Sequence, residues 1–333
     1  MLIINLEGIK MIKILIFILL LLSGCSVDIS ESLFIASIGF EMKDEKINGY
    51  FYIPLSSDVG KANEEGKGSG EFVRVAADTI EQVFNNVDAV NSININLKHV
   101  SSVVLNESLF NDEFILEFIN YVKYSNRLDY NFYLFTTTEK MEDIYSFKNP
   151  NQESVLNSLL VISGDNAGIR LVADPVHYLD FCKKYYSQRS ILIPMLDIEE
   201  LWNIEGKKEK NFYPQSAIYF YKGNVCEVKK EKGSPYFKSK INFYDEIEKE
   251  PIYFSKYKMA LSREGIIKII LKYESFDKKV ERSKVAKLVE NRINDYLRKY
   301  SEYDPLDLAF LNEVYNNSLK YSDLKIKINI LVN

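Results

Sequence analysis

The chain has 333 residues, with 42 Lys and Arg, 47 Asp and Glu and only 2 His, which gives a formal net charge of −5. This length is sufficient for two or three domains that each bury a hydrophobic core. A mildly acidic chain lacks the excess of basic residues that nucleic-acid binding requires, so we expect no nucleic-acid partner.

The first element is an apolar run over residues 14–22, preceded by Lys10 and Lys13. A membrane span, a buried core segment and a secretory signal can all begin this way. The run is shorter than the roughly 20 apolar residues of a membrane-spanning helix, and basic residues before such a run are typical of a signal peptide. We therefore predict a secretory signal, which begins at either Met1 or Met11.

A cysteine directly follows this signal. The four residues at its end resemble a bacterial lipobox, in which the cysteine thiol receives a diacylglycerol before the signal is cleaved: Leu22, Ser23, Gly24 and Cys25. We predict a signal peptide over residues 1–24 and lipid attachment at Cys25. Cleavage would leave 40 basic and 46 acidic residues, a net charge of −6. No later stretch has spanning length, so we expect a soluble chain tethered by its lipid.

The first half of the mature chain alternates between strand and helix patterns. Apolar alternation predicts strands over residues 32–42, 50–55, 72–77, 99–105 and 130–137. Apolar residues at helical spacing predict one helix that opens at Asp78 and Thr79 and a second around Ile115 to Val122. The segment 56–71 is rich in Gly, Ser and charge, and its GKGSGE lacks the spacing of a phosphate-binding loop, so we expect an exposed loop.

A third helix and a boundary follow. Asp174 and Pro175 favour a helix start, after which Tyr178, Phe181, Cys182 and Tyr185 fall on one apolar face. A strand is predicted from residue 190 and ends at Pro194. Apolar density then falls while Lys and Glu accumulate, and we place the domain boundary near residues 203–212.

The second half has a hairpin pattern over residues 217–228, with Lys222, Gly223 and Asn224 at its turn. Strands are then predicted over 252–262, 266–276 and 324–332, a long helix over 283–300 and a short helix around 306–317. These patterns predict an α+β protein of two to three mixed domains with mostly antiparallel sheets. The N-terminal region would cover residues 25–205 and the C-terminal domain residues 213–333. A partly parallel sheet fits the alternation as well.

No motif in the sequence indicates catalysis. A nucleophile would need a nearby base, yet His99 precedes a strand, His177 lies on a predicted helix, and no G-x-S-x-G is present. Metal-binding spacings such as C-x-x-C and H-E-x-x-H are absent from the sequence, and no spacing singles out a pair of carboxylates. We expect no catalytic, cofactor-binding or metal-binding residue. Cys182 and Cys226 either form a bridge or remain two separate buried thiols.

The order of these elements resembles the Ger(x)C family, the C-subunit lipoproteins of bacterial spore germinant receptors. The resemblance starts at SGC, the end of the lipobox. It continues through a first strand pair, a helix with its following strand and a hairpin. A long helix, a short helix and a closing strand complete it. The segments that carry it are IASIGFEMKDEKINGYFYIP, ADTIEQVFNNV, LKHVSSVVLNESLF, AIYFYKGNVCEV, DYLRKYSEYDPLDLAFLNEVYN and LKIKINILVN.

The chain departs from the family pattern at a few positions. Ser26 and Val27 stand where the family commonly has a Trp-Asp pair, and Lys98 stands where it has a glycine before the histidine. Asp307 and Ala309 replace glycines near the short C-terminal helix. Any surface built on these positions would differ from that of other family members.

The resemblance implies a non-enzymatic protein that takes part in nutrient-triggered spore germination. It would be lipid-anchored on the outer face of the spore inner membrane or cell membrane, beside two integral membrane receptor subunits of the A and B types. It also implies a three-domain α+β fold, so the N-terminal region would consist of two subdomains. The alternative is a cell-envelope lipoprotein of another class, either a solute-binding protein or a hydrolase.

Overall fold

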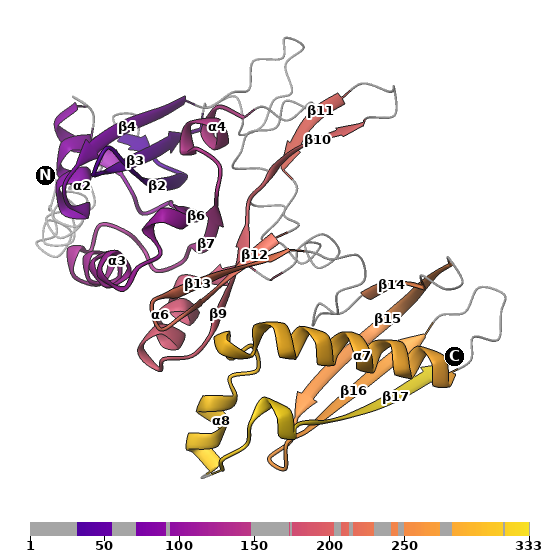
Figure 1. Cartoon of the computed structure of the whole chain (residues 1–333). Coiled ribbons are helices and arrows are strands. Elements are labelled where there is room, and N and C mark those ends of the chain that lie inside the picture. Colours follow the sequence, from indigo (N-terminus) through magenta and orange to yellow (C-terminus); the bar gives the residue numbers. More distant parts are fainter. Residues whose placement is uncertain are drawn as a thin grey trace, which may run out of the picture.

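The computed structural model describes residues 32–54, 71–90, 94–147, 173, 175–202, 208–212, 216–229, 241–245, 250–273, 282–315 and 317–332. The predicted signal peptide, its lipobox and most of the predicted loop over residues 56–71 lie outside this part of the chain. The fold is mixed α/β, with more sheet than helix among the described residues (Figure 1).

A nine-stranded sheet forms the larger part of the described structure. Its strands follow the order β13-β12-β9-β7-β6-β2-β3-β4, and β8 pairs with the first part of β7. Their bounds are β2 Ser37–Lys43, β3 Lys46–Ile53, β4 Glu71–Ala77, β6 Ser102–Asn106, β7 Tyr133–Thr137, β8 Val176–His177, β9 Ile191–Met195, β12 Ser216–Tyr221 and β13 Asn224–Lys229.

The middle of this sheet is parallel. Strand β6 pairs in parallel with both β2 and β7, and β7 pairs in parallel with β9, whereas both flanks of the sheet are antiparallel. Most of the described strand pairs are antiparallel, as expected, and the parallel centre agrees with the alternative of a partly parallel sheet. Strands buried on both faces read as continuous apolar runs, and β6, with the sequence SVVLN, is of this kind.

Helices cover both faces of the sheet. α2 (Ile80–Val90), α3 (Asp112–Ser125) and α6 (Tyr178–Tyr186) pack on one face and form the main core with alternate strand residues such as Phe40 and Val103. The short helix α4 (Met141–Ser146), which the sequence patterns did not indicate, packs on the other face. Figure 1 shows α2 and α3 together beside the strands and α4 apart from them.

The N-termini of α2 and α3 differ in how they are capped. At α2, the Gln82 amide donates to Thr79 Oγ1 over 3.2 Å, and the Gln82 side chain accepts from the Asp78 amide, so these two side chains satisfy two backbone donors at the predicted helix start. At α3, the Asn111 side chain accepts from the Phe114 amide over 2.8 Å. The apolar face predicted for α3 is confirmed, because its residues at helical spacing are buried.

The third helix begins later than predicted. α6 starts at Tyr178, and the His177 side chain accepts from the Leu179 amide at its N-terminus. The start predicted at Pro175 is wrong because Val176 and His177 first pair with β7, so their backbone groups belong to the sheet. Tyr178 and Phe181 are buried as predicted, whereas Cys182 is half-buried.

The hairpin of β12 and β13 belongs to the main sheet. β12 pairs antiparallel with β9, so the sheet continues past the boundary predicted near residues 203–212. Alternate residues of β12 enter different cores: Ile218 and Phe220 pack in the main core, whereas Ala217 and Tyr219 pack against α7 (Arg282–Tyr300) in a second core. A strand that is buried on both faces thus joins the two halves of the chain.

The second sheet has four strands, in the order β14-β15-β16-β17. Their bounds are β14 Ile241–Asp245, β15 Glu250–Leu261, β16 Ile266–Tyr273 and β17 Lys325–Val332. β16 and β17 are parallel, because α7 and α8 (Leu308–Tyr315) lie between them in sequence and carry the chain back to the same end. Figure 1 shows α7 lying across this sheet, and α7 contributes Val289, Ile293 and Leu297 to the second core.

Two smaller strand pairs complete the description. β10 (Ile198–Trp202) and β11 (Lys208–Phe212) form an antiparallel ribbon within the segment taken as a boundary. This ribbon was missed because half of its residues are Glu or Lys, which are uncommon in strands. β1 (Ser32–Phe34) pairs in parallel with β5 (Asn94–Asn96), directly before β2.

Candidate functional site: a pocket and junction beside the main sheet

The residues singled out from the sequence do not converge on one site. Cys25 and the lipobox residues Leu22, Ser23 and Gly24 lie outside the described part of the chain. Cys182 and Cys226 are both free thiols, so the structure contains no bridge between them. Burial raises the pKa of both thiols, which keeps them protonated and poorly nucleophilic near neutral pH.

Both histidines have local structural contacts. The His99 ring lies edge-on to Phe34, with 5.2 Å between ring centroids. The His177 Nε2 lies 3.2 Å from the Asn131 side-chain oxygen, and its Nδ1 caps α6. Neither contact places a histidine beside a hydroxyl or thiol as a catalytic base would require. Within the described residues, no group of three or more His, Cys, Asp or Glu side chains is placed to hold a metal ion.

A pocket of about 700 Å³ lies between the start of α3, the end of α6 and the turn of the β12–β13 hairpin. Sequence patterns gave no signal for it, because its lining comes from four separate elements. Tyr185 and Phe220 form its aromatic wall, with stacked rings 6.2 Å apart. Asp112 and Glu113 supply negative charge, and Lys222 supplies positive charge.

The hairpin turn fits closely against α3. Lys222 and Gly223 both have positive φ angles, of 49° and 76°, as a two-residue hairpin turn requires. A Cβ atom on Gly223 would lie only 2.7 Å from Asp112 Oδ2, so a side chain at this position would require the Asp112 carboxylate to shift. Desolvation, followed by the negative charge of Asp112, raises the pKa of the Tyr185 phenol. The pocket therefore presents a neutral aromatic wall next to charges of both signs.

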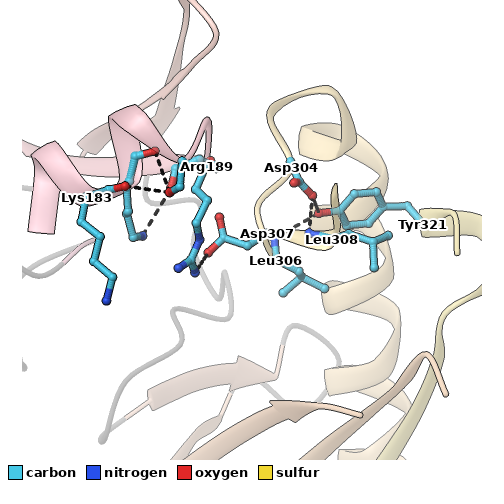
Figure 2. A network of polar contacts seen from close by, with 10 residues as sticks. Lys183, Arg189, Asp304, Leu306, Asp307, Leu308 and Tyr321 are labelled. Carbon is cyan, nitrogen blue, oxygen red and sulfur yellow. Dashed lines mark hydrogen bonds and ion pairs between the residues drawn. The ribbon is translucent and has the colours of Figure 1, made fainter. Parts of the chain in front are cut away.

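Beside the pocket, an ion pair joins the two halves of the chain. Arg189, in the loop between α6 and β9, pairs with Asp307, in the loop before α8 (Figure 2). Asp307 has a φ of 54°, a left-handed conformation that favours glycine and is open to Asp. The backbone at this position thus suits glycine, and Asp307 adds a carboxylate that contacts Arg189.

The loop that carries Asp307 is itself held by a buried carboxylate. Asp304 Oδ1 accepts from the Leu308 amide over 2.6 Å and from the Tyr321 hydroxyl over 2.7 Å. Figure 2 shows Tyr321 reaching this loop, where its hydroxyl also accepts from the Leu306 amide. Burial and the bond to Asp304 raise the pKa of Tyr321, so its hydroxyl stays protonated as a donor. These bonds fix the loop in the geometry that meets Arg189.

A second buried carboxylate, Glu41, lies on the opposite face of the main sheet. It is 7% exposed, and its two oxygens accept from the Tyr50 hydroxyl over 2.7 Å and from the Met141 amide over 3.0 Å. These bonds tie α4 to the sheet. Both oxygens are occupied by donors, so the structure assigns Glu41 a structural role.

The geometry of the pocket suits binding better than acid–base catalysis. Asp112 and Glu113 are neighbours on one helical turn, whereas a pair of catalytic carboxylates stands on opposite sides of a substrate. The pocket combines aromatic surface with a few charged groups, which is the usual make-up of a recognition site.

The comparison with protein-family models agrees with the resemblance seen in the sequence. The family model described as "Spore germination protein N-terminal domain" matches residues 26–198, which is more than half of the chain. A solved structure titled "Crystal Structure of the GerBC protein" is similar at 13% identity and a TM-score of 0.39, covering 89% of this chain and 96% of that one. The search of curated proteins gave no significant match.

None of the helices in the described part of the chain combines the length and apolar character that crossing a membrane requires. The family match includes β1 to β9 with α2, α3, α4 and α6 and ends at the first residue of β10, so it covers most of the main sheet and the α3 and α6 walls of the pocket. The chain belongs to the Ger(x)C family of spore germination proteins.

Proposed function

We propose that the chain is a lipid-anchored, non-enzymatic subunit of a membrane germinant receptor that takes part in nutrient-triggered spore germination. Its anchor would be a diacylglycerol on Cys25, on the outer face of the spore inner membrane. Its partners would be two integral membrane subunits, of the A and B types.

One observation carries this proposal. The family match begins at residue 26, directly after the cysteine of the predicted lipobox. The start of the family domain and the predicted cleavage site before Cys25, which rest on different residues, therefore lie one residue apart. This supports a mature chain whose first residue is Cys25 and whose folded part begins a few residues later, at β1.

The described residues give the alternatives less support. The pocket lies along one sheet and its helices, whereas a solute-binding protein would place its ligand between two similar lobes. A hydrolase would need opposed acid and base groups, which the neighbouring positions of Asp112 and Glu113 do not provide.

The anchor is tested with a Cys25→Ala chain that is expressed without other receptor subunits. Because an uncleaved apolar signal also holds a chain at a membrane, residues 1–24 are replaced in this variant by a signal with an ordinary cleavage site. The variant is expected to fold but to leave the membrane fraction after a high-salt wash, since two acyl chains are the source of stable attachment. Fractionation followed by immunoblotting measures the change.

The matched control is Cys182→Ala in the chain with its own signal. This variant loses a half-buried thiol and keeps the anchor, so it should remain in the membrane fraction. The proposed anchor is wrong if the Cys25→Ala chain stays with washed membranes to the same extent as this control.

A further inference from the structure

We propose that one end of the main sheet rests on the lipid surface of the membrane to which Cys25 is attached. We call this end the anchor-proximal surface and define it by Lys98, Lys123, Tyr124, Tyr130 and Leu179. The inference rests on the proposed function, because it takes Cys25 as the anchor. It adds the orientation of the folded domain on the membrane and the residues that touch the lipid.

The topology of the sheet determines which end lies near the anchor. β2, β6 and β7 are parallel, so their first residues, Ser37, Ser102 and Tyr133, are paired at one end of the sheet. β1 ends three residues before β2 begins and therefore lies at this same end of the sheet. The first described residue, Ser32, belongs to β1.

The distance to the anchor is limited by the length of the chain. Six residues lie between Cys25 and Ser32, and the seven Cα-to-Cα steps that join them span at most about 25 Å in a fully extended chain. The bilayer must therefore lie within that distance of β1. The opposite end of the sheet is farther from the anchor, because β2 alone adds roughly 20 Å over its seven residues.

A continuous series of contacts links β1 to the anchor-proximal surface. Phe34 of β1 meets the His99 ring, and the neighbouring Lys98 Nζ donates to the Asn126 carbonyl over 2.7 Å. Asn126 is the C-cap of α3, so the last turn of α3 lies beside β1. Lys98 also forms an ion pair with Asp129, over 3.3 Å, next to Tyr130.

The start of α6 lies at the same end of the sheet. The Tyr130 ring stacks on Tyr178, with 5.9 Å between centroids, and its hydroxyl donates to the Lys123 carbonyl over 3.3 Å. His177 packs against Tyr133, the first residue of β7. Leu179 follows on the first turn of α6. The elements that carry Tyr124, Tyr130 and Leu179 therefore end or begin near β1.

The side chains at this end of the sheet are of the types found where proteins meet a membrane surface. Tyr124 is 70% exposed, Leu179 52% and Tyr130 40%. Tyrosine is enriched where a protein meets lipid headgroups, because its ring is apolar and its hydroxyl is polar. The Lys123 ammonium lies 4.9 Å from the centre of the Tyr124 ring and is exposed, so it is placed to meet anionic headgroups.

Lipid is the occupant that the short tether favours. A tether of at most about 25 Å holds the anchor-proximal surface near the bilayer at a high local concentration, whether or not another protein is bound. A surface of a receptor subunit is the competing occupant. The two are separated by a measurement in vesicles that contain lipid and this chain alone.

The experiment uses the lipidated full mature chain in vesicles of mixed phosphatidylcholine and phosphatidylglycerol. The chain has a single tryptophan, Trp202, which is first replaced by Phe. A new probe is then introduced as Tyr124→Trp on the anchor-proximal surface. The matched control is Met42→Trp, because Met42 is 41% exposed and lies near the far end of β2. Fluorescence is compared with and without lipids whose acyl chains are brominated near the glycerol end.

We expect brominated lipid to reduce the emission of the Tyr124→Trp chain by about twofold or more and to leave that of the Met42→Trp chain nearly unchanged, because only the first probe would lie at the headgroup level. Equal quenching of both probes, or none at position 124, would overturn the inference. Flotation of the same samples identifies which proposal has failed. Flotation that depends on Cys25 without quenching at 124 leaves the anchor intact and excludes the orientation. A lipidated chain that does not float overturns both.

Discussion

Replacing Phe118 with Ala is expected to lower the free energy of unfolding by about 3–5 kcal/mol, the usual range for removing a buried aromatic ring. Phe118 is fully buried on α3, at the centre of the main core. Its ring lies 6.1 Å from those of both Phe40 and Tyr178, so it joins the sheet to two helices. Urea unfolding of the mature chain, followed by circular dichroism, measures the change.

A control on the same helix separates core packing from helix propensity. Leu116 is 42% exposed, so Leu116→Ala should change stability by no more than about 0.5 kcal/mol. A loss of under about 1 kcal/mol for Phe118→Ala would contradict the description of this core, because it would mean that the site collapses without a cavity.

Replacing Tyr219 with Ala should cost about 3 kcal/mol or more and should act on the junction between the two halves of the chain. Tyr219 is 3% exposed and lies on the face of β12 that meets α7. Its hydroxyl is hydrogen-bonded to that of Tyr296, and its ring lies 5.8 Å from that of Tyr300. Hydrogen exchange of the α7 amides should become faster in this variant.

Tyr219→Phe is the matched control, because it keeps the ring and removes only the hydroxyl. Its cost should be about 1 kcal/mol, the net value of one hydrogen bond. If α7 amides are equally protected in Tyr219→Ala and in the unmodified chain, then β12 does not link the two cores as the structure indicates.

The helices were the most predictable part of the fold. Ile80, Val83 and Phe84 begin the apolar stripe of α2, and all three are fully buried. The helix predicted over residues 283–300 is α7, whose apolar stripe includes the buried Val285, Val289 and Ile293, whereas Leu288 is only half-buried. Such stripes are local, since every residue that decides them lies within a few turns.

Strand partners were less predictable, because pairing depends on residues far apart in the sequence. The apolar run of β12 indicated burial, yet nothing local showed that Ile218 and Tyr219 would enter different cores or that β9 would be the partner. The start of α6 was misjudged for a similar reason. Pro175 gives a strong local signal for a helix, but pairing of Val176 with β7 takes precedence.

The candidate site could not be read from the sequence. Asp112, Tyr185 and Lys222 come from three elements that only the folded chain brings together. The pairing of Arg189 with Asp307 is similarly distant in sequence. Only the lipobox has a local signature, and Cys25 remains a prediction because it lies outside the described residues.

The assignment as a receptor subunit is tested most directly by isolating the chain from spores. An affinity-tagged chain is purified from detergent-extracted spore inner membranes, and its stoichiometric partners are identified by mass spectrometry, with the Cys25→Ala chain as the control. We expect the unmodified chain to be recovered with two multi-spanning membrane proteins and with a diacylglycerol on its N-terminal cysteine. Recovery of the chain alone, or with an unmodified N-terminus in the soluble fraction, would contradict its role as a lipid-anchored receptor subunit.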